Sequence, residues 1–432
     1  MDGLTGPRQW IYPQSVKGRF QFLHRWTGLV LQLILFVTPW LMVDGRPLVR
    51  IDLAARRLYL FGGVFTPSDT AFVAILGLGA AFALFFLTSL FGRLWCGYAC
   101  PQTVFLEEWI RPIEKFFEGD RGQRMASDKK GWSARKVLRK AGKFSAFALV
   151  AGVTAMTLVS YFAGARMLWT GAGSAAAYAL VAVFGGVMFA DFAWFREQFC
   201  NYLCPYARFQ GALSDNRTLA VTYDVARGEP RGQAGACIAC NKCVTVCPQG
   251  IDIRDGFQLE CINCARCVDA CEGVMGKLHQ PSLVGYATQS GKWTFLRGRT
   301  FVYGGLLAMI AVMGMLLAYN RHDLDGMVSR APGSLFVVDA DGWTRNTFLV
   351  RLSSKEMAPE TYAVSVRGLP AEAEVIVSSV ELPPGQSVTF PLIIRIPPAN
   401  GSARTLPLEV VLTSATDTLS LNATFKTNAS ES

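Results

Sequence analysis

Five long apolar stretches divide the chain into membrane-spanning and water-soluble segments. They are Trp26 to Val43, Ala71 to Phe91, Phe144 to Ala163, Ala175 to Phe195, and Phe301 to Tyr319. Each is close to the roughly 20 apolar residues that an α-helix needs to cross a bilayer. The second, third and fifth contain no charged residue. The pattern therefore predicts five transmembrane helices.

The hydrophobic pattern changes from about residue 331 onward. Short apolar and β-branched runs alternate there with turn residues, over residues 334–338, 347–352, 362–366, 374–380, 387–396 and 406–412. About seven strands in 100 residues is the size of an immunoglobulin-like β-sandwich. Between the first two spans, two short runs followed by Gly62-Gly63 indicate a small hairpin.

Composition supports a membrane protein with soluble parts. The 432 residues are 51% hydrophobic and only 17% charged, which is too apolar for an ordinary soluble chain of this size. The net charge of +10 is uneven, because residues 320–432 hold nine Lys and Arg against 12 Asp and Glu. The basic excess carries no nucleic-acid-binding motif. We therefore expect a membrane partner and no nucleic acid.

The segments that connect the spans differ in their Lys and Arg content. Residues 92–143 and 196–300 contain 12 each, whereas residues 164–174 contain only Arg166. Because Lys and Arg are enriched in cytoplasmic loops, the N-terminus and both basic segments are predicted to be cytoplasmic. With five spans, the C-terminal domain then lies on the opposite side. The loop at residues 44–70, with four arginines, weakens this bias without reversing it.

Eight of the 12 cysteines form two runs of the same spacing, C-x2-C-x2-C-x3-C. This spacing is typical of bacterial proteins that bind two four-iron, four-sulfur clusters, in which the last cysteine of each run binds the other cluster. Two zinc sites are the alternative, but cysteines at i, i+3 and i+6 fit tetrahedral zinc poorly. We assign one cluster to Cys237, Cys240, Cys243 and Cys271, and the other to Cys261, Cys264, Cys267 and Cys247.

The remaining four cysteines belong to an internal repeat with an offset of 104 residues. Cys96-Gly-Tyr-Ala-Cys100-Pro follows the second span, and Cys200-Asn-Tyr-Leu-Cys204-Pro follows the fourth. The first four spans therefore form two parallel repeats. Cysteines at i and i+4 share one face of a helical turn, and the proline is expected to end the helix at the second cysteine.

Three interpretations of these four thiols remain open. They could bind a soft metal such as Cu(I), exchange electrons as dithiols, or be inert buried residues at helix ends. The aspartate in the fourth span, Asp191, could act as a proton or ion group, but its position near one end favours an interfacial residue.

The domain plan that follows has five parts, in which the ferredoxin-like domain covers about residues 230–280. They are a cytoplasmic N-terminal segment (1–25), four transmembrane helices in two repeats (26–195), a cytoplasmic ferredoxin region (196–300), a fifth span (301–319) and an all-β domain (320–432). The predicted fold class is thus a five-span α-helical bundle with an inserted two-[4Fe-4S] domain and a C-terminal immunoglobulin-like sandwich.

These features together resemble the CcoG family, also called RdxA or FixG. The resemblance rests on the string from Cys96 to Phe105, the second C-x-Y-x-C-P motif, the paired cysteine runs with Cys247-Pro-Gln-Gly, and the β-rich tail, all in the same order. It covers nearly the whole chain. One departure is Glu272, which stands where a proline usually follows the last cysteine.

The resemblance implies a protein of the bacterial inner membrane with a periplasmic β-domain. It implies a role in assembling cbb3-type cytochrome oxidase by reducing Cu(II) to Cu(I), with Cys96, Cys100, Cys200 and Cys204 as copper or relay thiols. Expected partners are oxidase subunits or copper chaperones and a cytoplasmic electron donor. The alternatives are a quinol-linked electron-transfer subunit of the NapH or NosR type and a non-redox assembly scaffold.

Overall fold

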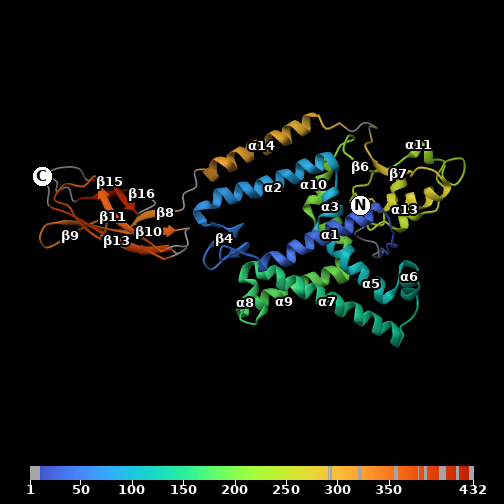
Figure 1. The fold of residues 1–432 in the computed structure, drawn as a ribbon, viewed down its shortest axis with the longest axis horizontal. Coiled ribbons are helices and arrows are strands. Elements are labelled where there is room, and N and C mark those ends of the chain that lie inside the picture. Colours follow the sequence, from blue (N-terminus) through green and yellow to red (C-terminus); the bar gives the residue numbers. More distant parts are fainter. Residues whose placement is uncertain are drawn as a thin grey trace. The chain divides into compact units, whose positions relative to one another are not determined.

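The computed structural model describes residues 10–289, 291, 294–319, 324–354, 359–377, 379–383, 387–397, 405–414 and 418–427. The chain divides into two compact units, Met1–Gly314 and Met315–Ser432 (Figure 1). The first holds the long helices and the cysteine-rich region, and the second is all β.

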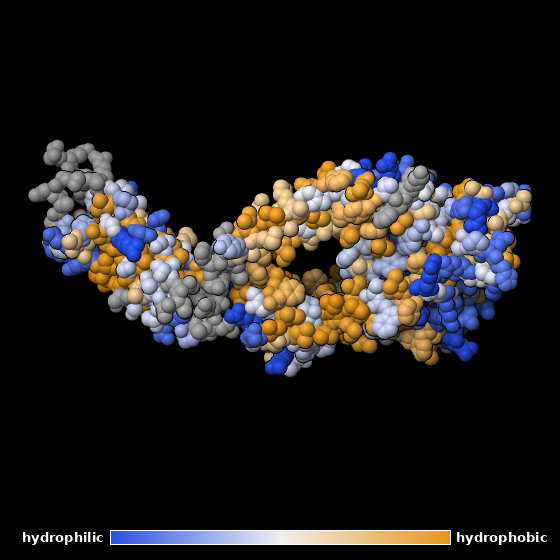
Figure 2. All heavy atoms as spheres, turned by 45° about the horizontal axis from the view of Figure 1, so that its top comes forward, coloured by the Kyte–Doolittle hydropathy of each residue, from blue (hydrophilic) through white to orange (hydrophobic). Residues whose placement is uncertain are grey.

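All five predicted spans are helices that are long and apolar enough to cross a membrane. They are α1 (Arg19–Val37), α2 (Thr70–Phe91), α7 (Ala134–Ala163), α9 (Ala175–Ala190) and α14 (Gly298–Tyr319). Figure 2 shows apolar residues gathered over these long helices, and hydrophilic residues over the end of the first unit that holds α6, α11 and α13. The chain is a multi-pass membrane protein.

Two spans begin earlier than the hydrophobic pattern predicts. Helix α1 starts at Arg19 instead of Trp26, and its added turn carries the buried polar residues Gln21 and His24. These side chains face neighbouring protein and not lipid, so a hydropathy pattern cannot detect them. Helix α7 starts ten residues before Phe144, and its first turns are basic.

One side of the helical region has a packed core. Helices α7 and α9 pack together, and Phe105, Ile110, Phe147 and Phe192 are buried between the elements there. By contrast, the apolar window of α2 has no buried residue, and α14 has almost none. These two helices expose their side chains to the surrounding lipid.

Short elements follow the spans. After α2 come α3 (Leu94–Tyr98), α4 (Pro101–Phe105), the π-helical turn η3 (Leu106–Ile110), α5 (Arg111–Glu118) and α6 (Arg121–Lys129). After α7 comes α8 (Ala165–Trp169), and after α9 come the π-helical turns η4 (Asp191–Phe195) and η5 (Phe199–Leu203), then α10 (Pro205–Leu213). The second motif therefore lies on a π-helical turn.

The predicted hairpin after the first span is confirmed and extended. A 3-10 turn, η1 (Thr38–Trp40), and the paired strands β1 (Met42–Val43) and β2 (Arg46–Pro47) come first. They precede an antiparallel three-stranded sheet of β3 (Val49–Asp52), β4 (Arg57–Leu60) and β5 (Gly63–Phe65), and the 3-10 turn η2 (Pro67–Asp69) leads into α2.

The cysteine-rich region is framed by one antiparallel pair of strands, β6 (Ala220–Tyr223) and β7 (Val284–Ala287). Between them lie α11 (Val225–Gly228), α12 (Lys242–Thr245), η6 (Ile253–Asp255), α13 (Arg266–Met275) and η7 (Gly276–Leu278). Its small core packs directly against the cysteines. The unusual Glu272 does not produce a turn, because α13 continues through it and its carboxylate pairs with Arg19 at 2.7 Å.

The second unit is the predicted β-sandwich. One sheet has the order β12-β14-β10-β8, with β9 also paired to β10, and the other has the order β13-β11-β15-β16. Their bounds are β8 (Leu324–Arg330), β9 (Val337–Val338), β10 (Thr344–Ser354), β11 (Glu360–Arg367), β12 (Glu374–Ile376), β13 (Ser379–Leu382), β14 (Ser387–Ile396), β15 (Thr405–Thr413) and β16 (Thr418–Lys426).

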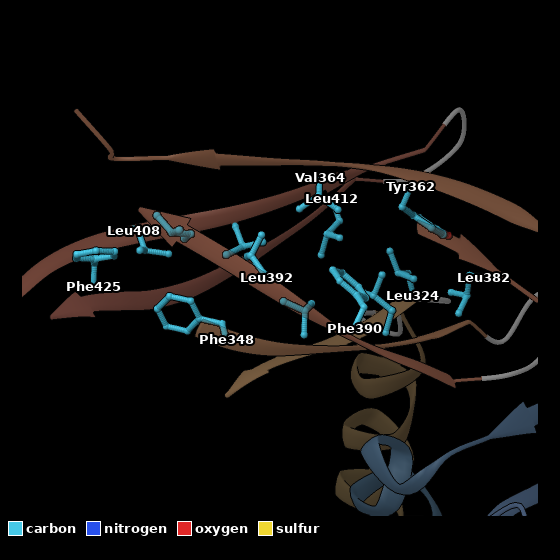
Figure 3. Packing of buried hydrophobic residues seen from close by; sticks show 14 of the residues in the cluster. Leu324, Phe348, Tyr362, Val364, Leu382, Phe390, Leu392, Leu408, Leu412 and Phe425 are labelled. Atoms are coloured by element: carbon cyan, nitrogen blue, oxygen red, sulfur yellow. The ribbon is translucent and has the colours of Figure 1, made fainter. Parts of the chain in front are cut away.

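The core between these sheets is apolar (Figure 3). Fully buried side chains from both sheets meet in it, among them Leu392, Leu412 and Phe425. The segment predicted as one strand at residues 374–380 is two strands, β12 and β13, which join different sheets. Strands β8 and β16 had not been predicted.

Candidate functional site

The eight clustered cysteines line two neighbouring pockets. The four thiols predicted for one cluster, Cys237, Cys240, Cys243 and Cys271, border a pocket of about 400 Å³. A second pocket of about 360 Å³ is bordered by the four predicted for the other cluster, Cys247, Cys261, Cys264 and Cys267, and also by Cys243. The fold thus brings the last cysteine of each run to the pocket of the opposite run.

The two runs use the same backbone conformation. In each run the residues before and after the second cysteine have positive φ. These are Ala239 and Asn241, at 55° and 56°, around Cys240, and Asn263 and Ala265, at 53° and 56°, around Cys264. Such left-handed residues turn the chain sharply. They wrap each loop around its pocket, a feature that the cysteine spacing alone does not reveal.

The chemistry of the second pocket fits a thiolate-bound cluster. Apart from its thiols, its lining is mostly apolar. Burial raises the pKa of Cys261 to about 11 and that of Cys264 to about 12. Such thiols ionise only when a cation binds them, since metal ligation requires the thiolate.

The thiols line the walls of the two pockets and do not meet at a single point. Among the described residues, no three His, Cys, Asp or Glu side chains converge on a position for one metal ion. A cubane, whose thiolates surround four irons, suits this spacing better than a single tetrahedral zinc. Cys237, Cys240, Cys243 and Cys271 would hold one cluster, and Cys247, Cys261, Cys264 and Cys267 the other. This ligand assignment stays a prediction.

The C-x-Y-x-C-P motifs form matching turns. In both, the second cysteine is extended and the following proline is the first residue of a new helix, α4 or α10. The Cys100 N–H donates to the carbonyl of Trp95 at 2.8 Å, and the Cys204 N–H donates to that of Phe199 at 2.9 Å. The predicted helix end is confirmed, although a new helix starts at once.

The fold gathers the four thiols of these motifs. Cys96 lies within electrostatic range of Cys204, and Cys200 lies within electrostatic range of Cys96 and Cys100, so the two pairs are close to each other. Burial raises the pKa of Cys96 to about 11 and that of Cys200 to about 12. The unloaded thiols of Cys96 and Cys200 are therefore protonated at neutral pH.

The first motif touches the loop of the second cluster pocket. Cys96 is buried in one apolar group with Ile262 and Cys264, and Tyr206 packs against it. Gly97 has no room for a side chain, because a Cβ atom there would lie 2.5 Å from the Ile262 carbonyl oxygen and 3.1 Å from the Cys264 backbone. A candidate relay thiol is thus buried in one group with a predicted cluster cysteine.

A buried cation lies between these two groups of thiols. Arg93 is 7% exposed, and its guanidinium donates to the Leu259 carbonyl oxygen. Its positive charge acts on Cys96 and Cys261, and on the Cys96 thiol also through a hydrogen bond. No ion pair of Arg93 with an acidic residue occurs in the described part of the chain.

Hydrogen bonds fix the cluster loop to the end of α2. The Asn263 side chain donates to the Phe91 carbonyl oxygen at 3.2 Å and accepts from the Val221 N–H at 3.2 Å. The Tyr286 hydroxyl donates to the Asn263 carbonyl oxygen at 2.5 Å. These bonds satisfy a helix end that would otherwise leave carbonyls unpaired.

The N-terminus of α1 is fixed in a similar way. The Asp269 carboxylate, between two cluster cysteines on α13, accepts from the N–H groups of Phe20 and Gln21 at 3.1 and 2.7 Å. A carboxylate at a helix N-terminus is electrostatically favourable. Gly18 is required there, because a Cβ atom would lie 2.2 Å from the Asp269 side chain.

Buried ion pairs complete the contact. Glu107 on η3 pairs with Arg111 at 2.5 Å and also with Arg266 of α13. Arg111 donates to the Pro248 carbonyl oxygen, one residue after Cys247, at 3.2 Å. Both clusters' loops are therefore held against the ends of the membrane helices by polar bonds.

The sequence singles out every cysteine but not the residues that surround them. Arg93, Gly97, Asn263 and Asp269 were not singled out. Only Gly97 left a signal, a glycine at the position where the second motif has Asn201. Arg93, Asn263 and Asp269 also contact Leu259, Phe91 and Phe20, which lie more than 150 positions away in the sequence, so no local pattern reports these contacts.

Family models match the main parts of the chain. A 4Fe-4S dicluster domain matches residues 195–234 and 230–289, and a 4Fe-4S binding domain matches residues 71–118. A model described as an IG-like fold at the C-terminal of FixG matches residues 315–428. The protein accordingly holds two [4Fe-4S] clusters and is an iron-sulfur electron-transfer protein.

Curated relatives match over most of the chain. Nitrogen fixation protein FixG of Rhizobium meliloti is 35% identical over 428 residues, covering 85% of this chain and 81% of its own length. Proteins RdxA and RdxB of Cereibacter sphaeroides are each 36% identical, covering 84% and 90% of this chain and 84% and 87% of their own lengths. With this identity and coverage, the chain belongs to the FixG/RdxA family.

Proposed function

We propose that the protein carries single electrons from a cytoplasmic donor through its two clusters to the C-x-Y-x-C-P thiols, where Cu(II) is reduced to Cu(I). The Cu(I) would serve the copper centre of a cbb3-type cytochrome oxidase during assembly. One observation carries this proposal: Cys96 shares one buried apolar group with Ile262 and Cys264, and Gly97 beside it packs on the Cys264 backbone, so the candidate acceptor motif adjoins a cluster loop.

The proposed reduction transfers one electron to each Cu(II) and leaves the thiols at the same oxidation state. Each electron converts one Cu(II) to one Cu(I), and the donor is a low-potential one-electron carrier. When bound, the clusters supply the one-electron transfer. The thiolates favour the product, because soft sulfur ligands select Cu(I). Copper displaces the thiol protons, which burial holds in place at neutral pH.

The exposure of the cluster cysteines suggests where electrons enter and leave. Cys240 is exposed, and Cys264 is buried beside Cys96. We infer that the donor docks near Cys240 and that electrons leave beside Cys264. This direction orders the two clusters along one path.

The proposed orientation follows the basic residues. With the cysteine-rich region and the basic segment 92–143 in the cytoplasm, the membrane is the inner membrane and the β-sandwich is periplasmic. The sandwich would then be the part that meets oxidase subunits or copper chaperones.

The test uses anaerobically purified protein with intact clusters and a low-potential reductant. Formation of Cu(I), followed with a Cu(I)-specific chelator, should be rapid with the wild-type protein and with Ala99→Ser, which changes the motif without removing a thiol. It should be about 10–100-fold slower in Cys96→Ser, which removes one thiol of the proposed copper site. No Cu(II) reduction by cluster-loaded protein would refute the proposal.

Two other outcomes would replace it. Electron exchange with a quinone analogue, but not with copper, would favour the quinol-linked alternative. Cluster-ligand variants that fold and still support oxidase assembly would favour a scaffold without redox function.

A further inference from the structure

A wide hollow lies between α5, α6 and the first turns of α7, away from the clusters. Its volume is about 1050 Å³, and it is lined mainly by polar and basic residues. They are Glu118, Gln123, Ala126, Ser127, Lys130, Gly131, Ser133, Arg135, Lys136 and Arg139.

Three of its four cations have no acidic partner. Lys130, Arg135 and Arg139 are exposed, and none of them forms an ion pair with an acidic residue within the described ranges. The fourth, Lys136, donates to the carbonyl oxygens of Ser127 and Lys130 at 2.7 and 2.8 Å. The hollow is therefore positively charged and suits an anion.

The single acid in the lining does not neutralise these cations. Glu118 is already engaged by Lys143 at 2.9 Å and by Lys140 at 3.5 Å. The hollow also faces the N-terminus of α7, a 30-residue helix capped by the Ser133 side chain. The partial positive charge of a helix N-terminus adds to the attraction for a phosphate group.

Helix α7 indicates that the hollow lies at headgroup depth. Leu149, inside the apolar span, is 67% exposed, and Leu138 is 75% exposed. The two are eleven residues apart, which returns to nearly the same helix face. This lipid-facing stripe therefore extends to Leu138, whose neighbours in sequence include Arg139.

Distances along the helix place Arg139 at the outer edge of the headgroup region and Arg135 beyond it, within reach of its side chain. Arg139 and Arg135 lie five and nine residues before Phe144, or about 7 and 14 Å at 1.5 Å per residue. The polar region of a bilayer is about 5–7 Å thick on each side, and arginine side chains can reach back several ångströms toward it. Trp132, 77% exposed beside Lys136, is an amphipathic side chain typical of the membrane interface.

We propose that this hollow binds the headgroup phosphate of an anionic phospholipid from the leaflet on the side of the cluster domain. Lys130, Arg135 and Arg139 contact the phosphate, and the acyl chains lie along the apolar stripes of α7. The site would anchor the α5–α7 region, which also carries Arg111. It does not depend on copper chemistry.

The test compares two double variants of the full-length, cluster-loaded protein in detergent. Arg135→Gln/Arg139→Gln removes two charges from the hollow, and Arg351→Gln/Arg367→Gln removes two from exposed strand positions of the β-sandwich. The probes are short-chain phosphatidylglycerol, short-chain phosphatidylcholine and inorganic phosphate, with binding followed by native mass spectrometry. Iron content reports folding.

Each cation near an anionic membrane surface contributes about fivefold to binding. The hollow variant should therefore bind phosphatidylglycerol about 25-fold more weakly than the wild type, and the sandwich variant should bind it unchanged. Equal weakening in both variants, or equal binding of phosphatidylcholine, would overturn the proposal. Competition by inorganic phosphate as strong as phosphatidylglycerol itself would instead identify a soluble phosphate site. This last measurement uses only the wild-type protein, so it stands even if the variants misfold.

Discussion

The two C-x-Y-x-C-P motifs have nearly the same sequence and the same local turn, but different surroundings. In each, the second cysteine N–H closes a turn on an aromatic residue five positions earlier, and a proline starts the next helix. The local sequence therefore determines the turn and the start of the next helix. The neighbours of each turn come from distant parts of the chain and are not repeated.

The differences all favour the first motif as the contact with the clusters. It has Gly97 where the second has Asn201, and Gly97 packs tightly against the cluster loop. Tyr98 is 9% exposed and Tyr202 is 36% exposed. The repeat has therefore diverged, and we infer that the first copy receives the electron while the second contributes thiols to the copper site.

The largest expected effect follows from filling the contact at Gly97. In Gly97→Ala the new Cβ would meet backbone atoms at 2.5 and 3.1 Å, so the Ile262–Cys264 loop must move. A displacement of about 1 Å can cost about 100-fold in rate. Iron content should fall from eight toward four per chain, and Cu(II) reduction should fall at least about 100-fold.

The matched control is Asn201→Ala, the corresponding position of the second motif. It should keep its iron and most of its activity, as measured by iron and sulfide analysis and Cu(I) formation. If both variants behave alike, the two motifs are equivalent and the proposed asymmetry is wrong.

A smaller difference is expected between the two thiols. Both Cys96→Ser and Cys200→Ser should retain less copper, since a lost contact at a metal site typically costs about 10–100-fold in affinity or activity. Only Cys96→Ser should also slow the arrival of the electron, because Cys96 shares a buried group with Ile262 and Cys264 of the cluster loop. Stopped-flow reoxidation of the clusters by Cu(II), compared with copper retention in equilibrium dialysis, separates the two effects. Equal reoxidation rates in the two variants would contradict the path through Cys96.

Much of this architecture could be predicted because its signals are local. Cysteine spacing, apolar runs and strand alternation each depend on residues within one element, and they predicted the cluster cysteines, the spans and the sandwich. The sandwich core follows the same rule, because alternate residues such as Leu392 and Ile394 point inward along one strand.

The contact surface between the cluster domain and the helices could not be predicted from signals within one element. It is built from polar pairs such as Glu107 with Arg266, which lie 159 residues apart. A hydropathy pattern predicts that such charged residues are exposed to solvent, although Glu107 and Arg266 are both buried. For the same reason hydropathy assigns the first two turns of α1 to the polar N-terminal segment, although Gln21 and His24 are buried there.

The pH dependence of copper binding would sharpen the comparison further. Burial raises the pKa of Cys96 to about 11 and that of Cys200 to about 12, so both thiols are protonated between pH 6 and 8. Each thiolate that binds copper must release a proton, and the apparent affinity should rise about tenfold per pH unit for each one. Competition titrations with a Cu(I) chelator at several pH values give this slope. If the slope of log affinity against pH falls by one in Cys96→Ser and also in Cys200→Ser, both motifs provide a copper ligand. An unchanged slope in one variant excludes the altered thiol as a ligand.

The smallest expected effect concerns the charge that precedes each motif by three residues, which is Arg93 in the first copy and Glu197 in the second. Arg93 acts on thiols of both the motif and the cluster loop. A cation there favours the extra negative charge of the reduced cluster, so Arg93→Gln should lower the midpoint potential of the adjacent cluster. At an effective dielectric constant near 20, the shift is on the order of 50–100 mV. Redox titration followed by electron paramagnetic resonance measures it. Arg93→Lys keeps the charge and should restore most of the potential, whereas Glu197→Gln should shift it little. If Arg93→Gln leaves the potential unchanged, Arg93 has only a structural role.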